Sequence, residues 1–158
     1  MDAANGSDAP ANELEALVTD LSASGPVSFV FGNGWLTTHV VGATRPLFRG
    51  PSERRWWHVE HGDPESKWVL DVRLDQVERV RFSREVSEFS SNGQESLVVR
   101  FFAESDATAL HCYLGDIHDG RRLRAERLRT WEELRLRYGD RDESRVVDGS
   151  LRAPAVAA

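Results

Sequence analysis

An arginine interrupts an otherwise apolar row in residues 77–86, where the residue types alternate as they do in a β-strand. Arg84 shares its predicted face with Val80, Phe82 and Val86. A guanidinium among apolar side chains needs a carboxylate, a cluster of carbonyls or a bound anion, because an unpaired buried charge is costly. Three interpretations of Arg84 stay open: a structural ion pair, a strand end that reaches solvent, and an anion-binding site.

A histidine and a tyrosine lie two residues apart in the alternating segment 108–114, so they are predicted to share one face of a strand. His111 and Tyr113 can line an apolar cavity and still offer polar tips to a ligand. The alternative is that both are packed strand residues with satisfied hydrogen bonds.

Two histidines and a glutamate gather in residues 56–61. His58 and Glu60 point to one side of a predicted strand, and His61 follows in the turn. These residue types can bind a divalent metal, although exposed histidine and glutamate on a strand edge is the alternative, so no metal ligand is assigned. No glycine-rich loop precedes a helix, and nothing resembles a nucleophile elbow. The sequence therefore predicts no catalytic set and leaves open whether the protein is an enzyme.

Two helices and about seven strands must position these residues. An apolar stripe with Asn12 as N-cap predicts a helix over 12–23, and a second stripe predicts one over 120–138. Between them, β-rich segments bounded by turn residues predict strands over 27–31, 35–41, 55–60, 68–74, 77–86, 96–102 and 108–114. This order predicts an α+β domain whose N- and C-terminal helices flank one face of a large, twisted antiparallel sheet.

The chain divides into one domain and two loose ends. Residues 1–10 are small and polar and predict a disordered lead-in, whereas 11–138 predict the single domain. Residues 139–158 become charged and then rich in alanine and proline, which predicts a loose C-terminal tail.

Composition excludes several classes of protein. The 158 residues carry a net charge of −6, which argues against nucleic acid as a partner. No apolar run approaches the ~18–20 residues that cross a bilayer, so no membrane insertion is expected. The acidic N-terminus lacks the features of a secretory signal, and a lone cysteine, Cys112, excludes internal disulfides. The expected compartment is the cytoplasm.

Five segments, in order, resemble one repeat of the HemS/ChuX haem-utilisation (hemin-degrading) family. Residues 25–39 are similar to its opening hairpin, which ends in a histidine, here His39. Residues 68–80, 94–102 and 109–115 resemble three later strands, the last carrying His111 and Tyr113. Trp131 and Leu134 match the ending of its final helix. Gly32 replaces the family's arginine before the first turn, and Glu85 follows Arg84 where the family has proline.

The resemblance implies a haem-binding protein in the cytoplasm that acts as a carrier or buffer in haem and iron utilisation. A haem-degrading enzyme of the same family and an interaction module that has lost haem are the alternatives. Haem needs apolar walls, an arginine at the rim and a basic or phenolate iron ligand. The resemblance thus implies that Arg84, His111, Tyr113 and His39 bind haem, and we expect the first three on one face of the sheet. A single repeat, together with five Trp, seven Phe and two Tyr, predicts a homodimer.

Overall fold

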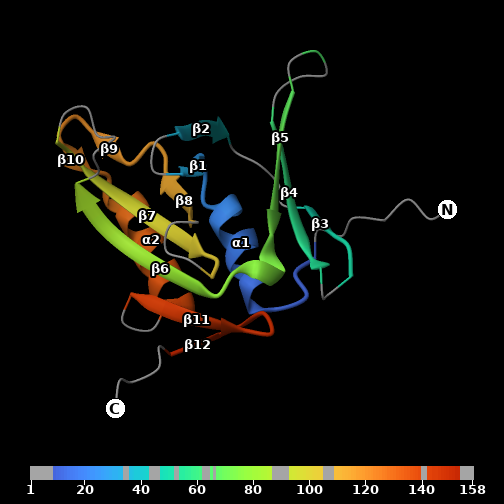
Figure 1. Ribbon diagram of the computed structural model, residues 1–158. Coiled ribbons are helices and arrows are strands. Elements are labelled where there is room, and N and C mark those ends of the chain that lie inside the picture. The colour runs from blue at the N-terminus through green and yellow to red at the C-terminus, as the bar shows by residue number, and fades with distance from the viewer. Residues whose placement is uncertain are drawn as a thin grey trace.

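The computed structural model describes residues 9–33, 36–42, 47–51, 54–61, 65, 67–86, 93–104, 109–139 and 142–153 (Figure 1). Its elements, in chain order, are α1 (Glu13–Ala23), β1 (Val27–Asn33), β2 (Leu36–Gly42), β3 (Leu47–Arg49), β4 (Trp56–His61), β5 (Trp68–Arg73), the short 3-10 helix η2 (Leu74–Gln76), β6 (Arg79–Val86), β7 (Glu95–Phe102), β8 (Ala109–Leu114), β9 (His118–Asp119), β10 (Arg122–Leu123), α2 (Ala125–Tyr138), β11 (Glu143–Val147) and β12 (Ser150–Arg152).

A large antiparallel sheet forms the centre of the molecule. Within the described residues its seven strands have the order β12-β11-β6-β7-β8-β1-β2. Strands β3, β4 and β5 form a second sheet that stands beside the first, and β9 pairs with β10 alone (Figure 1). The predicted α+β class is therefore confirmed. The strands that make up the main sheet differ from the expectation. β4 and β5 belong to the second sheet, and the main sheet contains β11 and β12 instead.

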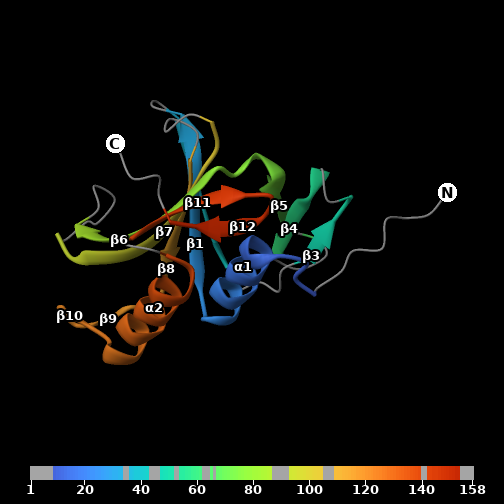
Figure 2. The same ribbon diagram turned by 90° about the horizontal axis from the view of Figure 1, so that it is seen from below.

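Both helices lie on one face of the main sheet, as the sequence predicts (Figure 2). The rings of Trp131 in α2 and Phe82 in β6 are 6.4 Å apart, and the Trp131 indole donates a hydrogen bond to the Val98 carbonyl. Trp57 of the second sheet packs against Phe29 and Phe101 of the main sheet, with centroids 5.6 and 6.2 Å away. One core therefore joins the two sheets and the two helices.

Helix α1 begins where the capping residues predict. The Asn12 side chain accepts a hydrogen bond from the Glu15 backbone N–H at 2.9 Å and donates one to the Glu15 carboxylate at 3.1 Å. The apolar stripe of Leu14, Leu17, Val18 and Leu21 is buried. Glu15 is also buried, and its carboxylate accepts two hydrogen bonds from Arg55 at 3.1 and 3.2 Å.

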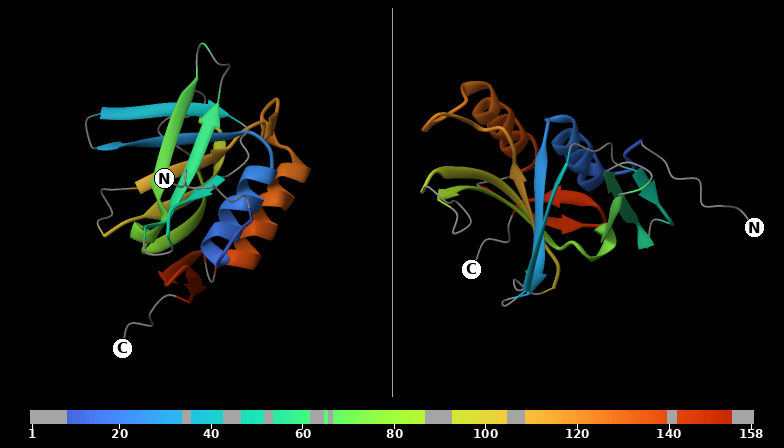
Figure 3. Two further views of the ribbon diagram at one scale, coloured as in Figure 1. Left: turned by 90° about the vertical axis from the view of Figure 1, so that its right-hand side faces the viewer. Right: turned by 90° about the horizontal axis from the view of Figure 1, so that it is seen from above.

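Helix α2 begins five residues later than predicted, because residues 118–123 form the β9–β10 hairpin with Gly120 at φ +60°. Arg127 links α2 to the end of α1. It donates to the Ser24 carbonyl and, at 3.1 and 3.2 Å, to the Gly115 carbonyl. Figure 3 shows the two helices side by side. Neither described helix is long and apolar enough to cross a bilayer.

The structure corrects the expected loose tail at 139–158 over the part that it describes beyond Gly139, residues 142–153. β11 pairs with β6, β12 pairs with β11, and the Gly149 carbonyl accepts a hydrogen bond from the Leu14 N–H at 2.9 Å. These strands are short and charged, so alternation is hard to detect in the sequence. Of the predicted lead-in, only Ala9 and Pro10 fall within the described residues, and both are exposed.

Candidate functional site

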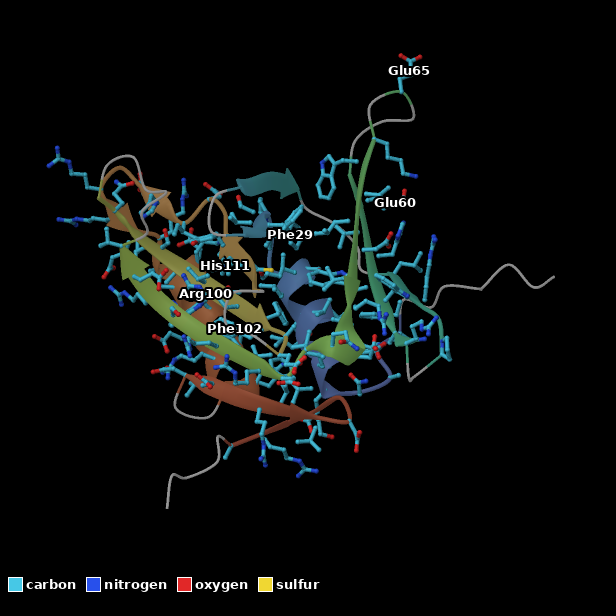
Figure 4. The ribbon with its side chains drawn as sticks, in the orientation of Figure 1. Phe29, Glu60, Glu65, Arg100, Phe102 and His111 are labelled. Atoms are coloured by element: carbon cyan, nitrogen blue, oxygen red, sulfur yellow. The ribbon has the colours of Figure 1, made fainter. Side chains whose placement is uncertain are left out.

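The main sheet has a second face, turned away from the two helices, which we call the open face. Strand register places Arg81, Arg100, His111, Val30 and His39 opposite one another in a single row across five strands. Directly opposed residues of antiparallel strands present their side chains on the same face, so the side chains of Arg81, Arg100, His111 and Val30 share the open face. Figure 4 shows Arg100 and His111 close together on β7 and β8. The predicted pairing of His111 with Tyr113 on one face is confirmed, because Tyr113 lies opposite Val98 in the next row of that face.

Arg100 is the centre of a hydrogen-bonded network on the open face. Its Nε donates to His111 Nδ1 and its Nη1 to Ser83 Oγ, both at 2.8 Å. The Glu85 carboxylate accepts from both terminal nitrogens of the guanidinium, and Arg100 also interacts with the Tyr113 side chain. The Arg100 side chain is only 13% exposed, so these partners hold it in place.

The network decides which nitrogen of His111 carries a proton. Burial and the neighbouring Arg100 charge lower the pKa of His111, and Glu85 opposes this only in part. Nδ1 accepts from an arginine, which has no acceptor to offer, so the neutral ring carries its hydrogen on Nε2. His111 therefore presents an N–H donor at Nε2. A histidine that binds iron through Nε2 would need a lone pair there.

The lowered pKa of His111 predicts that acid destabilises the fold. The unfolded chain binds this proton more readily than the folded one, so stability is complete above the unfolded pKa of about 6.5 and falls as the pH drops below it. His111→Gln keeps an acceptor for Arg100 and removes the titration. Urea denaturation from pH 8 to pH 5 measures the free energy of unfolding. We expect wild type to lose more stability than His111→Gln over this range. Near pH 8 the difference between the two proteins should not change with pH. Parallel curves over the whole range would contradict this.

Arg84 does not join this group. It lies opposite Leu97, whose side chain is in the core on the helix side, and so occupies the other face of β6. Its side chain is 43% exposed and donates to the Glu95 carboxylate at 2.8 and 3.0 Å. The prediction that Arg84 shares a face with His111 and Tyr113 is wrong. Both structural interpretations hold instead, because the strand end reaches solvent and the guanidinium forms an ion pair.

Two further residues concern the candidate site: His39, which the sequence predicts, and Arg100, which it does not. His39 lies in β2 opposite Val30, but its side chain falls outside the described residues. Arg100 was not predicted, although its signal in the sequence matches that of Arg84, since it interrupts a row formed by Val98 and Phe102.

The histidine–glutamate cluster on β4 is a chain of hydrogen-bonded side chains. His58 is buried, and its Nδ1 lies 2.6 Å from the Asp71 carboxylate and its Nε2 2.8 Å from the Glu60 carboxylate. Each ring nitrogen therefore already has a carboxylate as its hydrogen-bond partner. A hydrogen bond from Lys67, and as the second largest cause one from His58, lowers the pKa of the Glu60 carboxyl to about 2. The side chain of His61 lies outside the described residues. No group of three or more metal-binding side chains is placed to hold an ion in the part of the chain that the structure describes.

Two cavities lie away from the open face. One of about 630 Å³ is mostly polar and lies between the start of α1, η2 and the β11–β12 hairpin. The other, about 310 Å³, lies between β5 and the main sheet and is lined by apolar side chains that include Phe31, Leu70 and Phe101. Neither includes His111, Tyr113 or Arg84.

Comparison with known proteins identifies the fold. No protein-family model matches the chain, and no curated protein matches it in sequence. Solved structures do match. ChuX superposes with a TM-score of 0.58 at 14% identity, over 79% of this chain and 71% of that chain. The chain has the ChuX fold. Protein AGR_C_4470 from Agrobacterium tumefaciens superposes with a TM-score of 0.59 at 20% identity, over 80% of this chain and 67% of that chain. ChuX is also one of the two names of the family that five segments of the sequence resemble.

Proposed function

We propose that this protein binds haem and acts as a cytoplasmic carrier or buffer in haem and iron utilisation. The observation that carries the proposal is the ChuX fold, shared over 79% of the chain. The order of the five similar segments supports it independently, because sequence order and fold point to the same family. The group around Arg100 on the open face is our candidate for the haem-contacting residues.

The polar groups of the open face match the polar edge of haem. Propionates need N–H or O–H donors, and His111 Nε2 offers one, while Arg100 holds His111 in place and directs its other donors to Ser83 and Glu85. The apolar floor is less complete, because Val30 and Val98 are buried beneath the polar layer. We therefore include the homodimer in the proposal, with a second copy supplying the facing apolar wall. His39 and Tyr113 are the candidate iron ligands, since His111 presents a donor.

Hemin titration tests the proposal directly. We expect saturable binding, followed by the haem absorbance band, and a mass of two chains by light scattering. His111→Ala should weaken binding about ten- to a hundredfold without shifting the band, because one hydrogen bond to a charged group contributes about 1.5–3 kcal/mol. His39→Ala or Tyr113→Phe should shift the band if that residue binds iron.

Three outcomes would contradict parts of this assignment. Weaker binding by Arg84→Ala with unchanged binding by His111→Ala would place the site on the other face of the sheet. Loss of the band with a reductant would indicate a haem-degrading enzyme, in which haem itself supplies the redox chemistry. Absence of saturable binding would leave an interaction module that has lost haem.

A further inference from the structure

Four arginines gather at the end of the open face formed by β6, β11 and β12. Arg152 lies directly opposite Arg145, and Arg145 lies directly opposite Arg79. Arg81 lies two residues beyond Arg79 on the same strand and therefore on the same face. We call Arg79, Arg81, Arg145 and Arg152 the arginine patch. Adjacent strands are about 4.8 Å apart, so the side chains of the row are direct neighbours.

The positive charge of the patch is only partly balanced. Glu143 lies on the same face and accepts hydrogen bonds from Arg81 at 2.9 Å and Arg79 at 3.4 Å. Arg145 and Arg152 are exposed, and neither forms an ion pair with any residue that the structure describes. Like charges directly opposite one another destabilise a sheet, so the fold carries a cost here. The chain as a whole has a net charge of −6, opposite in sign to the patch.

The surroundings of the patch indicate what it can bind. Arg79 and Arg81 lie over the Phe102 ring, with centroid distances of 4.7 and 5.0 Å, and leave Phe102 only 5% exposed. The patch thus lacks the exposed ring on which a nucleic-acid base would stack. Glu143 already demonstrates that a carboxylate bridges two of these guanidinium groups, which match carboxylates in shape.

We propose that the arginine patch docks a carboxylate-rich segment of a partner protein. Incoming carboxylates would pair with Arg145 and Arg152 as Glu143 pairs with Arg79 and Arg81. The contact would relieve the repulsion along the row, and its charge would steer association. Arg81 borders the group around Arg100, but Arg145 and Arg152, the two exposed arginines that take the incoming carboxylates, lie two strands or more away from Arg100, so the docking does not depend on haem binding.

Fluorescence anisotropy with a labelled glutamate-rich peptide tests the proposal on the full chain. We expect binding at low salt that weakens as salt is added. Arg145→Gln/Arg152→Gln should weaken it about tenfold, because two exposed ion pairs of up to about 1 kcal/mol each are lost. The matched control is Arg121→Gln/Arg122→Gln, which removes the same charge from the exposed β9–β10 hairpin and should change affinity less than about twofold. Glu143→Gln, which removes the acid of the patch, should tighten binding.

Several results would overturn the proposal. If the two double variants lose the same affinity for the peptide, binding depends on the net charge of the protein alone. Weaker binding by Glu143→Gln would exclude electrostatic docking at the patch. Tighter binding of an oligothymidylate of the same charge would assign the surface to nucleic acid. Circular dichroism and melting curves that match wild type would confirm that the variants fold.

Discussion

Replacing Trp57 with alanine is expected to lower the free energy of unfolding by about 3–5 kcal/mol, the range for a large aromatic removed from a core. Its side chain is fully buried and touches Phe29 and Phe101 across the junction of the two sheets. The β3–β4–β5 sheet would lose its main anchor on the main sheet. Urea denaturation measures the change in the free energy of unfolding, provided that the variant and wild type have the same m-value.

Trp56 provides a control in the neighbouring position. It lies on the other side of β4, half-buried beneath the Arg73 guanidinium at 5.1 Å, and Trp56→Ala should cost about 1 kcal/mol. The Trp57 indole nitrogen is buried without a hydrogen-bond partner among the described residues. Trp57→Phe removes that unsatisfied donor and should cost less than Trp57→Ala. Equal losses for Trp56→Ala and Trp57→Ala would contradict the assignment of Trp57 to the junction.

Replacing Arg127 with methionine is expected to cost about 3 kcal/mol. The substitution leaves the Ser24 and Gly115 carbonyls without their donor, and since both residues are half-buried, each costs about 1–2 kcal/mol, the lower part of the range for a buried acceptor. Gly25 at φ +124° brings its backbone close to this guanidinium, since a Cβ there would lie 3.0 Å from Arg127 Nη1. Arg127 therefore links the end of α1, the start of α2 and the end of β8. Thermal and urea unfolding both report the loss.

Two variants separate this role from a general effect of charge. Arg129→Met changes an exposed arginine two positions along the same helix and should lie within about 0.5 kcal/mol of wild type. Arg127→Lys keeps the charge, but a single ammonium does not reproduce the fork that reaches both carbonyls, so its stability should be intermediate. A fully stable Arg127→Lys would indicate that charge alone matters.

Local patterns predicted the elements that depend on local interactions. The Asn12 cap and the leucine stripe determine α1, and the Asn-Gly pair in the sequence at 33–34 predicts the hairpin by which β1 and β2 pair. β11 depends instead on pairing with β6, a partner distant in sequence, and β12 pairs with β11, so their short charged segments gave no signal. Whether a residue favours a β-strand depends largely on how its side chain packs against neighbouring strands.

The candidate site was only partly accessible to sequence for the same reason. Arg84 and Arg100 each interrupt an apolar row, and alternation cannot reveal which interruption lies at a strand end. Register decides it, because Arg84 lies near the solvent-exposed end of β6 whereas Arg100 lies opposite His111 within the sheet. His111 and Tyr113 were predicted together because their separation of two residues is a local property.

The strand order has a consequence for how quickly this chain can fold. β1 pairs with β8, β6 pairs with β11, and the Leu14 N–H reaches the Gly149 carbonyl, so many contacts join residues far apart in sequence. Such a high contact order places folding in the range of milliseconds to seconds, since loop closure must precede most of the stabilising pairs. During synthesis, α1 and β6 have to wait for the last hairpin to leave the ribosome before their final partners exist. A nascent chain halted before β11 is therefore expected to expose the edge of β6 to other strands.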